Sequence, residues 1–377
     1  MKKLSIILLM SFVMLGCSEN SEELKANNNS SIQQTKKEKG KNEKPPIIFE
    51  RKSEPRENAF SLLVPKGWQI DGGIFRVDPT VQGGPSQSIA AKLDFAIKKD
   101  TEGSVMIRWL PDVLFFDMRN SPAGQMGLFP EGINYQGMTV YNLMNAENFI
   151  SRIAFPYAHP QAQNVQIIER KNLQTFASQY ATWVKQAMPY TTMSYDAAYL
   201  KIQYSEAGKV YDEYLLTLIE NWGQLGAGMW GNKETFLVRA PQGELEKWES
   251  IFSVIQNSVK LNINWLMAEI KGQAARGEIA ANTQKEIERI GREITEHKQK
   301  TNAEINNDMF LTLTEQEEYV NPYNNEVETG TNQWKHRWVN ESGDVIYTDE
   351  ESYDPNIDIN LNSSDFKRSN IRKRFPN

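Results

Sequence analysis

The chain contains one cysteine, Cys17, and a single thiol can serve several kinds of chemistry. An exposed thiolate is a nucleophile or a metal ligand, a buried thiol is a small apolar filler, and a thiol beside a membrane is an attachment point for acyl chains. Because no second cysteine is present, the sequence excludes an intrachain disulfide and a zinc site built from several cysteines. The residues around Cys17 must decide among the remaining roles.

The segment before Cys17 has the features of an export signal. It has a positive start, MKK, and its apolar run, residues 4–16, is shorter than the roughly 20 residues of a membrane-spanning helix. The small residue Gly16 stands directly before the cysteine. This arrangement resembles the lipobox of bacterial lipoproteins, with Met14 where leucine is more usual. An ordinary secretory signal followed by a stray thiol is the alternative interpretation.

The lipobox resemblance implies cleavage before Cys17, a diacylglycerol on its sulfur and often a further acyl chain on the new amino terminus. Two or three acyl chains make a stable anchor, since each buried CH₂ contributes about 0.8 kcal/mol. We therefore expect a lipid-anchored, extracytoplasmic protein at the cell membrane or outer membrane. In that case the anchor consumes the thiol.

The remaining reactive side chains form no recognisable catalytic motif. The three histidines, His159, His297 and His336, lie in different segments, and the sequence contains neither HExxH nor G-x-S-x-G. We interpret each histidine as a surface or packing residue. The sequence accordingly predicts no catalytic residue, no cofactor and no firm set of metal ligands.

The sequence GAGMWG at 226–231 satisfies the pattern G-x-G-x-x-G. A dinucleotide site needs a helix directly after this pattern, because the helix N-terminus holds the pyrophosphate. The residues that follow, NKETFLVRAP, are typical of a strand. We therefore predict a glycine-rich connection between strands at this point.

The segment DPNIDINLNSSD has oxygen-bearing residues at the spacing of a calcium loop. Positions 1, 3, 5, 7, 9 and 12 of that template are occupied by Asp354, Asn356, Asp358, Asn360, Asn362 and Asp365. Against a calcium site, Ile359 stands where the sharp turn favours glycine, and no helix pair flanks the segment. A solvated loop rich in Asp and Asn is the favoured interpretation, and weak calcium binding stays open.

The bulk composition is that of a folded protein that does not bind nucleic acid. The 377 residues are 40% hydrophobic and 10% aromatic, which is enough for a sizeable core. The formal net charge is -6 and the pI is near 5.4, whereas nucleic-acid binding usually requires a basic patch.

Shifts in composition divide the chain into six segments. They are a signal peptide (1–16), the lipidated cysteine with a disordered tether (17–45), a globular domain (46–260), a long helix (261–314), a three-stranded aromatic meander (315–360) and a polar, basic tail (361–377).

Alternating hydrophobicity predicts antiparallel strands with helices in the globular domain. Leu93, Phe95 and Ile97 alternate with polar residues, and the strand after the next turn repeats the pattern. We expect a helix that is capped by Asn145 and ends before Pro156, and an amphipathic helix near residue 250. The predicted fold class is α+β, an antiparallel sheet packed with helices. The opening FSLLVPKGW and the closing SVIQNSVKL resemble the PsbP-like fold.

The last third of the chain begins with the predicted long helix, which lies along the domain or forms a coiled-coil-like arm for self-association. In the meander, Trp334, His336 and Trp338 are predicted to share one face with Val345 and Tyr347 of the facing strand. We expect this aromatic face to pack on the long helix instead of binding a ligand. The arrangement is similar to a recurring tail of uncharacterised exported bacterial proteins.

Two function classes follow from these observations. The favoured one is a non-enzymatic envelope lipoprotein that is attached to the bilayer through Cys17 and binds an envelope protein or glycan. The alternative is an envelope hydrolase, because carboxylates are the only abundant groups for acid–base catalysis. The sequence shows no carboxylate pair that would carry it.

Overall fold

The computed structural model describes residues 46–77, 91–135, 138–187, 192–223, 226–269, 316–361, 363 and 365–372. Cys17, the predicted tether and the predicted long helix beyond residue 269 lie outside these ranges, and residues 263–269 are helical. The helical elements are α3 (Pro122–Gln125), α4 (Ala146–Phe149), the π-helical turn η1 (Ile150–Ala154), α5 (Phe155–Ala158), α6 (Gln174–Ala187), η3 (Leu245–Trp248), α7 (Glu249–Asn257) and η5 (Pro355–Ile357).

The strands before residue 262 are β1 (Ile47–Ser53), β2 (Phe60–Pro65), β3 (Gln69–Phe75), β4 (Lys92–Lys98), β5 (Met106–Trp109), β6 (Leu114–Phe116), β7 (Asn134–Tyr135), β8 (Met138–Val140), β9 (Gln163–Asn172), β10 (Ser194–Glu206), β11 (Lys209–Asn221), β12 (Met229–Pro241) and β13 (Lys260–Leu261). The strands after residue 315 are β14 (Gln316–Val320), β15 (Val327–Thr331), β16 (His336–Val339), β17 (Val345–Thr348), β18 (Lys367–Arg368) and β19 (Asn370–Ile371).

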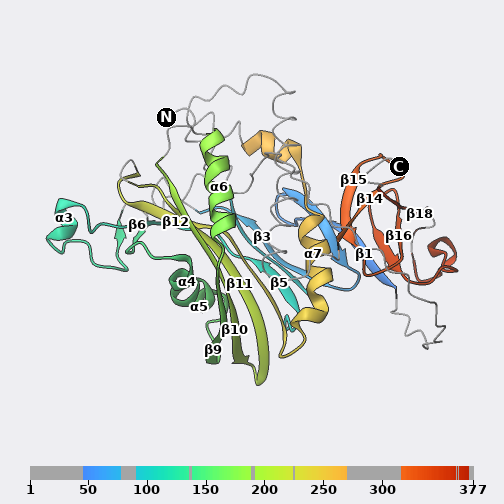
Figure 1. Ribbon diagram of the computed structural model, residues 1–377, viewed down its shortest axis with the longest axis horizontal. Coiled ribbons are helices and arrows are strands. Elements are labelled where there is room, and N and C mark those ends of the chain that lie inside the picture. Colours follow the sequence, from blue (N-terminus) through green and yellow to red (C-terminus); the bar gives the residue numbers. More distant parts are fainter. Residues whose placement is uncertain are drawn as a thin grey trace, which may run out of the picture.

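A ten-stranded sheet dominates the molecule, with the order β3-β4-β5-β12-β11-β10-β9 and a branch at β6, β7 and β8 (Figure 1). Its pairs are antiparallel except for β6 with β8. The long strands β10 and β11 are joined at Ala207 and Gly208, whose φ angles of 49° and 77° fit the tight hairpin turn that matches strand twist. This sheet contains the predicted hairpin, because Phe95 pairs with Trp109 and Ile97 pairs with Ile107.

The two faces of the ten-stranded sheet are covered by different elements. On one face, α6, α7 and the strands of a second sheet pack on the large sheet and form the larger hydrophobic core. In this core the ring of Phe60, from the second sheet, contacts the ring of Phe95, from the large sheet, with centroids 5.4 Å apart. On the other face, α4, η1 and α5 pack on β10, β11 and β12 around Trp230, which is fully buried. The apolar packing of α4 and α5 on this face does not reach β3 and β4. That end of the second face carries polar side chains.

The second sheet has six strands in the order β13-β2-β1-β17-β16-β18, and it joins the two described ends of the chain. The first strand, β1, pairs with β2 on one side and with β17 on the other, where Phe49 lies opposite Val345. In Figure 1, β1 lies beside the C-terminal strands. The C-terminal segment is therefore an integral part of the core.

The predicted fold class is wrong, because the structure is mostly β, with large antiparallel sheets and few helices. The predicted three-stranded meander is wrong as well. The strands β14 and β15 form a small sheet with β19, whereas β16 and β17 continue the sheet of β1. The unpaired edge of β1 supplies a partner for β17 that local sequence patterns cannot reveal.

The predicted aromatic face is also out of register by one residue. Tyr347 lies opposite Arg337, and Trp338 lies opposite Ile346, so Trp338 is on the opposite side of the sheet from Tyr347. Trp334 precedes β16 and is buried, with its ring centroid 5.8 Å from that of Tyr347. Trp334 therefore packs in the shared core, and Trp338 is only partly buried.

No helix within the described ranges combines the length and the apolar character that crossing a membrane requires.

Candidate functional site

A polar pocket of about 470 Å³ opens on the end of the large sheet that α4 and α5 leave uncovered. This volume is within the range of roughly 300–1,000 Å³ that is typical of small-molecule sites. The lining residues come from β3, β4, β5, β10 and β12, the turns beside them and the end of α5. They are Arg56, Asp71, Gly72, Phe75, Asp94, Ala96, Lys98, Glu102, Met106, Arg108, Ala158, His159, Glu206 and Arg239.

The alternation along β4 positions one wall of the pocket. Phe95 and Ile97 point into the larger core, so Asp94 and Lys98 point to the opposite face of the sheet. Gly72 of β3 has φ +80°, and a Cβ at this position would collide with the backbone carbonyl oxygen of Asp94. The glycine thus permits the close approach of β3 to the strand that carries the wall.

Paired charges form that wall. The Arg108 guanidinium holds the Asp94 carboxylate in two bonds, Nε to Oδ1 at 2.8 Å and Nη2 to Oδ2 at 2.9 Å. The Tyr157 hydroxyl donates to Asp94 Oδ2 at 2.8 Å. Lys98 forms an ion pair with Asp71, and its hydrogen bond holds the pKa of that carboxyl below the ordinary value. Asp71 therefore stays ionised at neutral pH.

Beneath the pocket lies a buried cluster that we call the pocket network: His159, Tyr204, Glu206, Glu213 and Arg239. His159 Nε2 is 2.7 Å from Glu213 Oε2, and its Nδ1 is 3.6 Å from Glu206 Oε1. The Tyr204 hydroxyl donates to Glu213 Oε2 at 3.0 Å. Arg239 Nη1 donates to Glu206 Oε2 at 2.6 Å and to the Tyr204 oxygen at 3.1 Å. Four charged groups thus balance one another inside the fold.

The carboxylate neighbours of His159 favour the protonated form of its imidazole ring. Burial alone would lower the pKa of His159, but the carboxylates of Glu213 and Glu206 outweigh burial and raise it above the ordinary value. The nearby His159, together with Arg239, lowers the pKa of Glu206 to about 2. Both imidazole nitrogens face carboxylates, which favours the protonated ring and leaves neither nitrogen free to bind a metal ion.

A helix of unusual form places His159 at the pocket. Asn145 caps α4 as predicted, accepting a bond from the Asn148 amide at 2.9 Å. The predicted end before Pro156 is wrong, because the π-helical turn η1 lets the helix continue into α5, with Pro156 in its first turn. Pro156 lies just beyond the π-helical turn, and it has no amide hydrogen to donate to that turn. The continued helix ends with the His159 amide bonded to the Phe155 carbonyl at 2.8 Å.

Two of the lining carboxyls, Asp71 and Glu206, have lowered pKa values and do not suit the role of a general acid. A general acid needs a carboxyl whose pKa is raised toward neutrality, whereas the pKa values of Asp71 and Glu206 are both lowered. Burial raises the pKa of Glu220, but this residue is not among those that line the pocket. Neither Asp71 nor Glu206 is therefore poised to act as the acid of the carboxylate hydrolase that the sequence left as an alternative.

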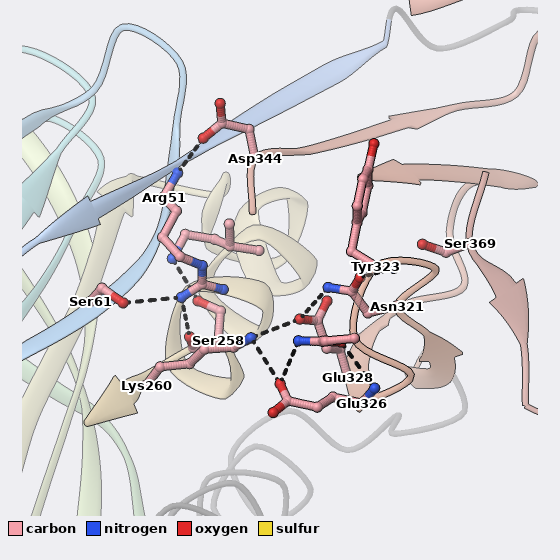
Figure 2. A network of polar contacts seen from close by, with 12 residues as sticks. Arg51, Ser61, Ser258, Lys260, Asn321, Tyr323, Glu326, Glu328, Asp344 and Ser369 are labelled. Carbon is pink, nitrogen blue, oxygen red and sulfur yellow. Dashed lines mark hydrogen bonds and ion pairs between the residues drawn. The ribbon is translucent and has the colours of Figure 1, made fainter. Parts of the chain in front are cut away.

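A second buried cluster, the junction network, holds the two described ends of the chain together (Figure 2). Arg337, 2% exposed, donates to Ser369 Oγ at 2.8 Å and forms an ion pair with Glu328. Lys260 donates to Glu328 Oε1 at 2.9 Å, and Arg51 Nη1 donates to the Ser258 carbonyl at 3.0 Å. Burial would raise the pKa of Glu328, but Arg337 and Lys260 lower it to about 2. We define this network as Arg51, Lys260, Glu328, Arg337 and Ser369.

The residues singled out in the sequence do not meet at the pocket. In the loop with calcium-like spacing, Asp354 accepts a bond from the Asn356 amide at 2.9 Å, and Asp358 accepts one from the Asn360 amide at 2.9 Å. Asn356 bonds to the Phe366 backbone, and Asn362 lies outside the described residues. In the part of the chain that the structure describes, no group of three or more His, Cys, Asp and Glu side chains is placed to hold a metal ion.

Two other sequence features have different outcomes. The GAGMWG pattern leads into β12, so the predicted connection before a strand is confirmed. His336 is partly buried, and its Nε2 lies 3.0 Å from Glu351 Oε2. His336 is not among the residues that line the pocket.

Sequence reasoning missed the pocket network. One signal was present in the sequence, because Arg239 stands within the apolar run FLVRAP of β12, and Glu213 lies directly before the apolar run YLL of β11. A charged residue is rarely fully buried unless it is paired. Such residues on neighbouring strands therefore predict partners for one another.

Comparison with known proteins gives no family. No protein-family model matches the chain, and no curated protein is significantly similar to it.

Proposed function

We propose that this protein is a lipid-anchored, extracytoplasmic binding protein that holds a small polar ligand in the pocket over β3, β4 and β5. The observation that carries the proposal is the pocket itself, whose lining includes the ion pairs Asp94–Arg108, Asp71–Lys98 and Glu206–Arg239 above the pocket network. Side chains held in this way lose little freedom when a ligand binds, which favours affinity. The lowered pKa values of two lining carboxyls, Asp71 and Glu206, support binding in preference to hydrolysis.

The anchor rests on the sequence around Cys17. Labelling of growing cells with an alkyne fatty acid should mark the wild-type protein and leave Cys17→Ser unmarked, with the variant released from the membrane fraction. Equal labelling of Cys17→Ser would contradict acylation at this position. The measurement concerns the anchor only and leaves the pocket to a separate test.

Binding can be tested with the full chain in a detergent that contains no sugar. A small-molecule extract of the cell envelope of the source organism should raise the melting temperature of the wild type, because a ligand that binds only the folded state stabilises it. Arg108→Met, which removes a pocket wall donor, should respond much less.

The matched control for that test is Arg119→Met. Arg119 also forms an ion pair with a neighbouring aspartate, Asp117, but neither residue lines the pocket. This variant should respond like the wild type. If the extract changes the melting temperature of all three proteins equally, or of none, the pocket is not the binding site.

A further inference from the structure

The pocket presents ion pairs where a site for a charged ligand would present unpaired charges. Asp94 is bound by Arg108, Asp71 by Lys98, and Glu206 by Arg239. A charged ligand group would have to break one of these pairs, and separating a partly desolvated pair leaves one of its charges without compensation. The lining therefore discriminates against ions.

The charges of the pocket and of its supporting network also cancel. The cations are Arg56, Lys98, Arg108, His159 and Arg239, and the anions are Asp71, Asp94, Glu102, Glu206 and Glu213. Counted with His159 in the protonated form that its two carboxylate neighbours favour, their sum is zero, with five of each sign. Such a site offers no net attraction to either an anion or a cation.

Arg56 is the lining cation for which the described residues supply no ion pair. Its Nη1 lies 3.5 Å from the Ile74 carbonyl oxygen, and its side chain is exposed. An exposed guanidinium is well hydrated and contributes little to the binding of an anion, since water screens it. Arg56 alone therefore does not make the pocket an anion site.

The paired groups keep unused hydrogen-bonding capacity. A guanidinium carries five N–H donors, and Arg108 uses two on Asp94 and one, at 3.4 Å, on the Ala158 carbonyl. A carboxylate has about four acceptor positions, and Asp94 accepts three bonds. Asp71 is 63% exposed and Lys98 is 22% exposed, so both can contact a ligand.

A hydroxyl group fits this alternation, because it donates one hydrogen bond and accepts others at the same atom. A ligand hydroxyl beside the Arg108–Asp94 pair would accept a hydrogen bond from the guanidinium and donate one to the carboxylate. The two bonds that join the pair would stay in place. Phe75, which is partly exposed, adds apolar surface to the lining, which suits a C–H face of a sugar ring. We propose that the ligand is a neutral, polyhydroxylated molecule, a mono- or oligosaccharide, recognised by the ion pairs of the wall. This inference rests on the proposed function.

The test is a titration of the full chain, in the same sugar-free detergent, with three classes of defined probe of similar size. The probes are neutral disaccharides such as maltose and N,N′-diacetylchitobiose, zwitterionic dipeptides such as Ala-Ala, and dicarboxylates such as succinate. Calorimetry should detect binding of at least one saccharide and of neither charged class. Arg108→Met should weaken that binding about tenfold or more, since a hydrogen bond to a charged group contributes about 1.5–3 kcal/mol. Arg119→Met should leave it unchanged.

Binding of dipeptides or dicarboxylates that Arg108→Met abolishes would overturn the saccharide assignment and keep the pocket as the binding site. Binding of no saccharide would also overturn the assignment. The envelope-extract experiment reports separately whether the pocket binds anything, so the two failures are distinguishable. Saccharide binding that persists in Arg108→Met would place the sugar site elsewhere.

Discussion

The pocket network and the junction network each enclose an arginine that is almost fully buried, Arg239 at 4% and Arg337 at 2% exposure. In the junction network, the carboxylate partner of the arginine, Glu328, is itself 12% exposed and contacts Lys260 from another strand. In the pocket network, the partner carboxylate, Glu206, is 22% exposed and lines the pocket. Similar chemistry thus stabilises the fold in one place and supports a ligand surface in the other.

The difference teaches that buried charge by itself does not mark a functional site. The junction network joins different sheets and segments, because Lys260 of β13 and Arg337 of β16 both pair with Glu328 of β15, and Arg337 also bonds to Ser369 near the C-terminus. The pocket network joins residues of the same sheet and its covering helix. A network that also contacts a cavity is the one that can respond to a ligand.

The largest expected effect is on the junction network. Glu328→Gln would remove the carboxylate from the buried guanidinium of Arg337, and an uncompensated buried charge costs about 3–5 kcal/mol. The free energy of unfolding, measured with denaturant, should fall by that amount. The matched control is Glu326→Gln, because Glu326 also contacts Lys260 but its side chain is 62% exposed, and it should cost less than about 1 kcal/mol. Equal losses would contradict a structural role for the buried pair.

The next effect is on the pocket network. Tyr204→Phe would remove the hydroxyl that donates to Glu213 and accepts from Arg239, at an expected cost of about 1–3 kcal/mol. Tyr211→Phe serves as a control, since it keeps the ring that lies 4.4 Å from the Arg239 guanidinium. If the two variants unfold at the same denaturant concentration, the Tyr204 hydroxyl does not stabilise the network.

A smaller expected effect is a difference between the two networks in how the free energy of unfolding depends on pH. The folded-state pKa of His159 is raised, so its contribution is complete below the unfolded value of about 6.5 and is lost as the pH rises through the folded pKa. Above pH 6.5 the wild type should therefore lose more stability than His159→Gln, whereas Glu328→Gln should follow the wild type. Parallel pH curves for wild type and His159→Gln would show that His159 is not held as a cation.

At acidic pH the two networks should lose their contributions to stability over the same pH range. Glu206 and Glu328 both have a pKa of about 2 in the folded state, below the unfolded value of about 4.3. The stability that each contributes is present above pH 4.3 and is lost as the pH falls toward 2.

The smallest effect on stability is expected at the pocket wall. The side chains of Asp94 and Arg108 are 25% and 23% exposed, so Asp94→Asn should change the free energy of unfolding by about 1 kcal/mol or less. The same variant should weaken ligand binding, because the carboxylate is part of the pocket lining. A large loss of stability would mean that the wall is a structural element like the junction network.

Local patterns in the sequence predicted the elements that depend on neighbours in the chain. The alternation of Leu93, Phe95 and Ile97 predicted the β4–β5 hairpin, and the apolar stripe near residue 250 predicted α7. The polar residues of the same alternation, Asp94 and Lys98, are those that form the pocket wall. A period of two shows that a strand has two faces, but it does not distinguish a face in water from a face in a pocket.

The parts that sequence reasoning missed depend on distant contacts or on backbone irregularity. His159 reaches the pocket because η1 carries the helix through Pro156, and a π-helical turn has no reliable sequence pattern. The predicted meander failed for the related reason that β17 pairs with β1, and nothing near β17 in the sequence indicates this partner. Such pairing is decided by the whole core.

The pairing of β1 with β17 has a consequence for biosynthesis. A chain emerges from the ribosome from its N-terminus, so β1 is made long before its partner, and the Arg51 amide must wait for Asp344, 293 residues later. Until β17 is made, the edge of β1 that carries Ile47, Ile48 and Phe49 lacks the strand with which it pairs in the folded protein. An unpaired apolar edge is prone to association with other chains. Completion of the six-stranded sheet is therefore a late event, and the nascent chain has reason to be protected until its last strands are made.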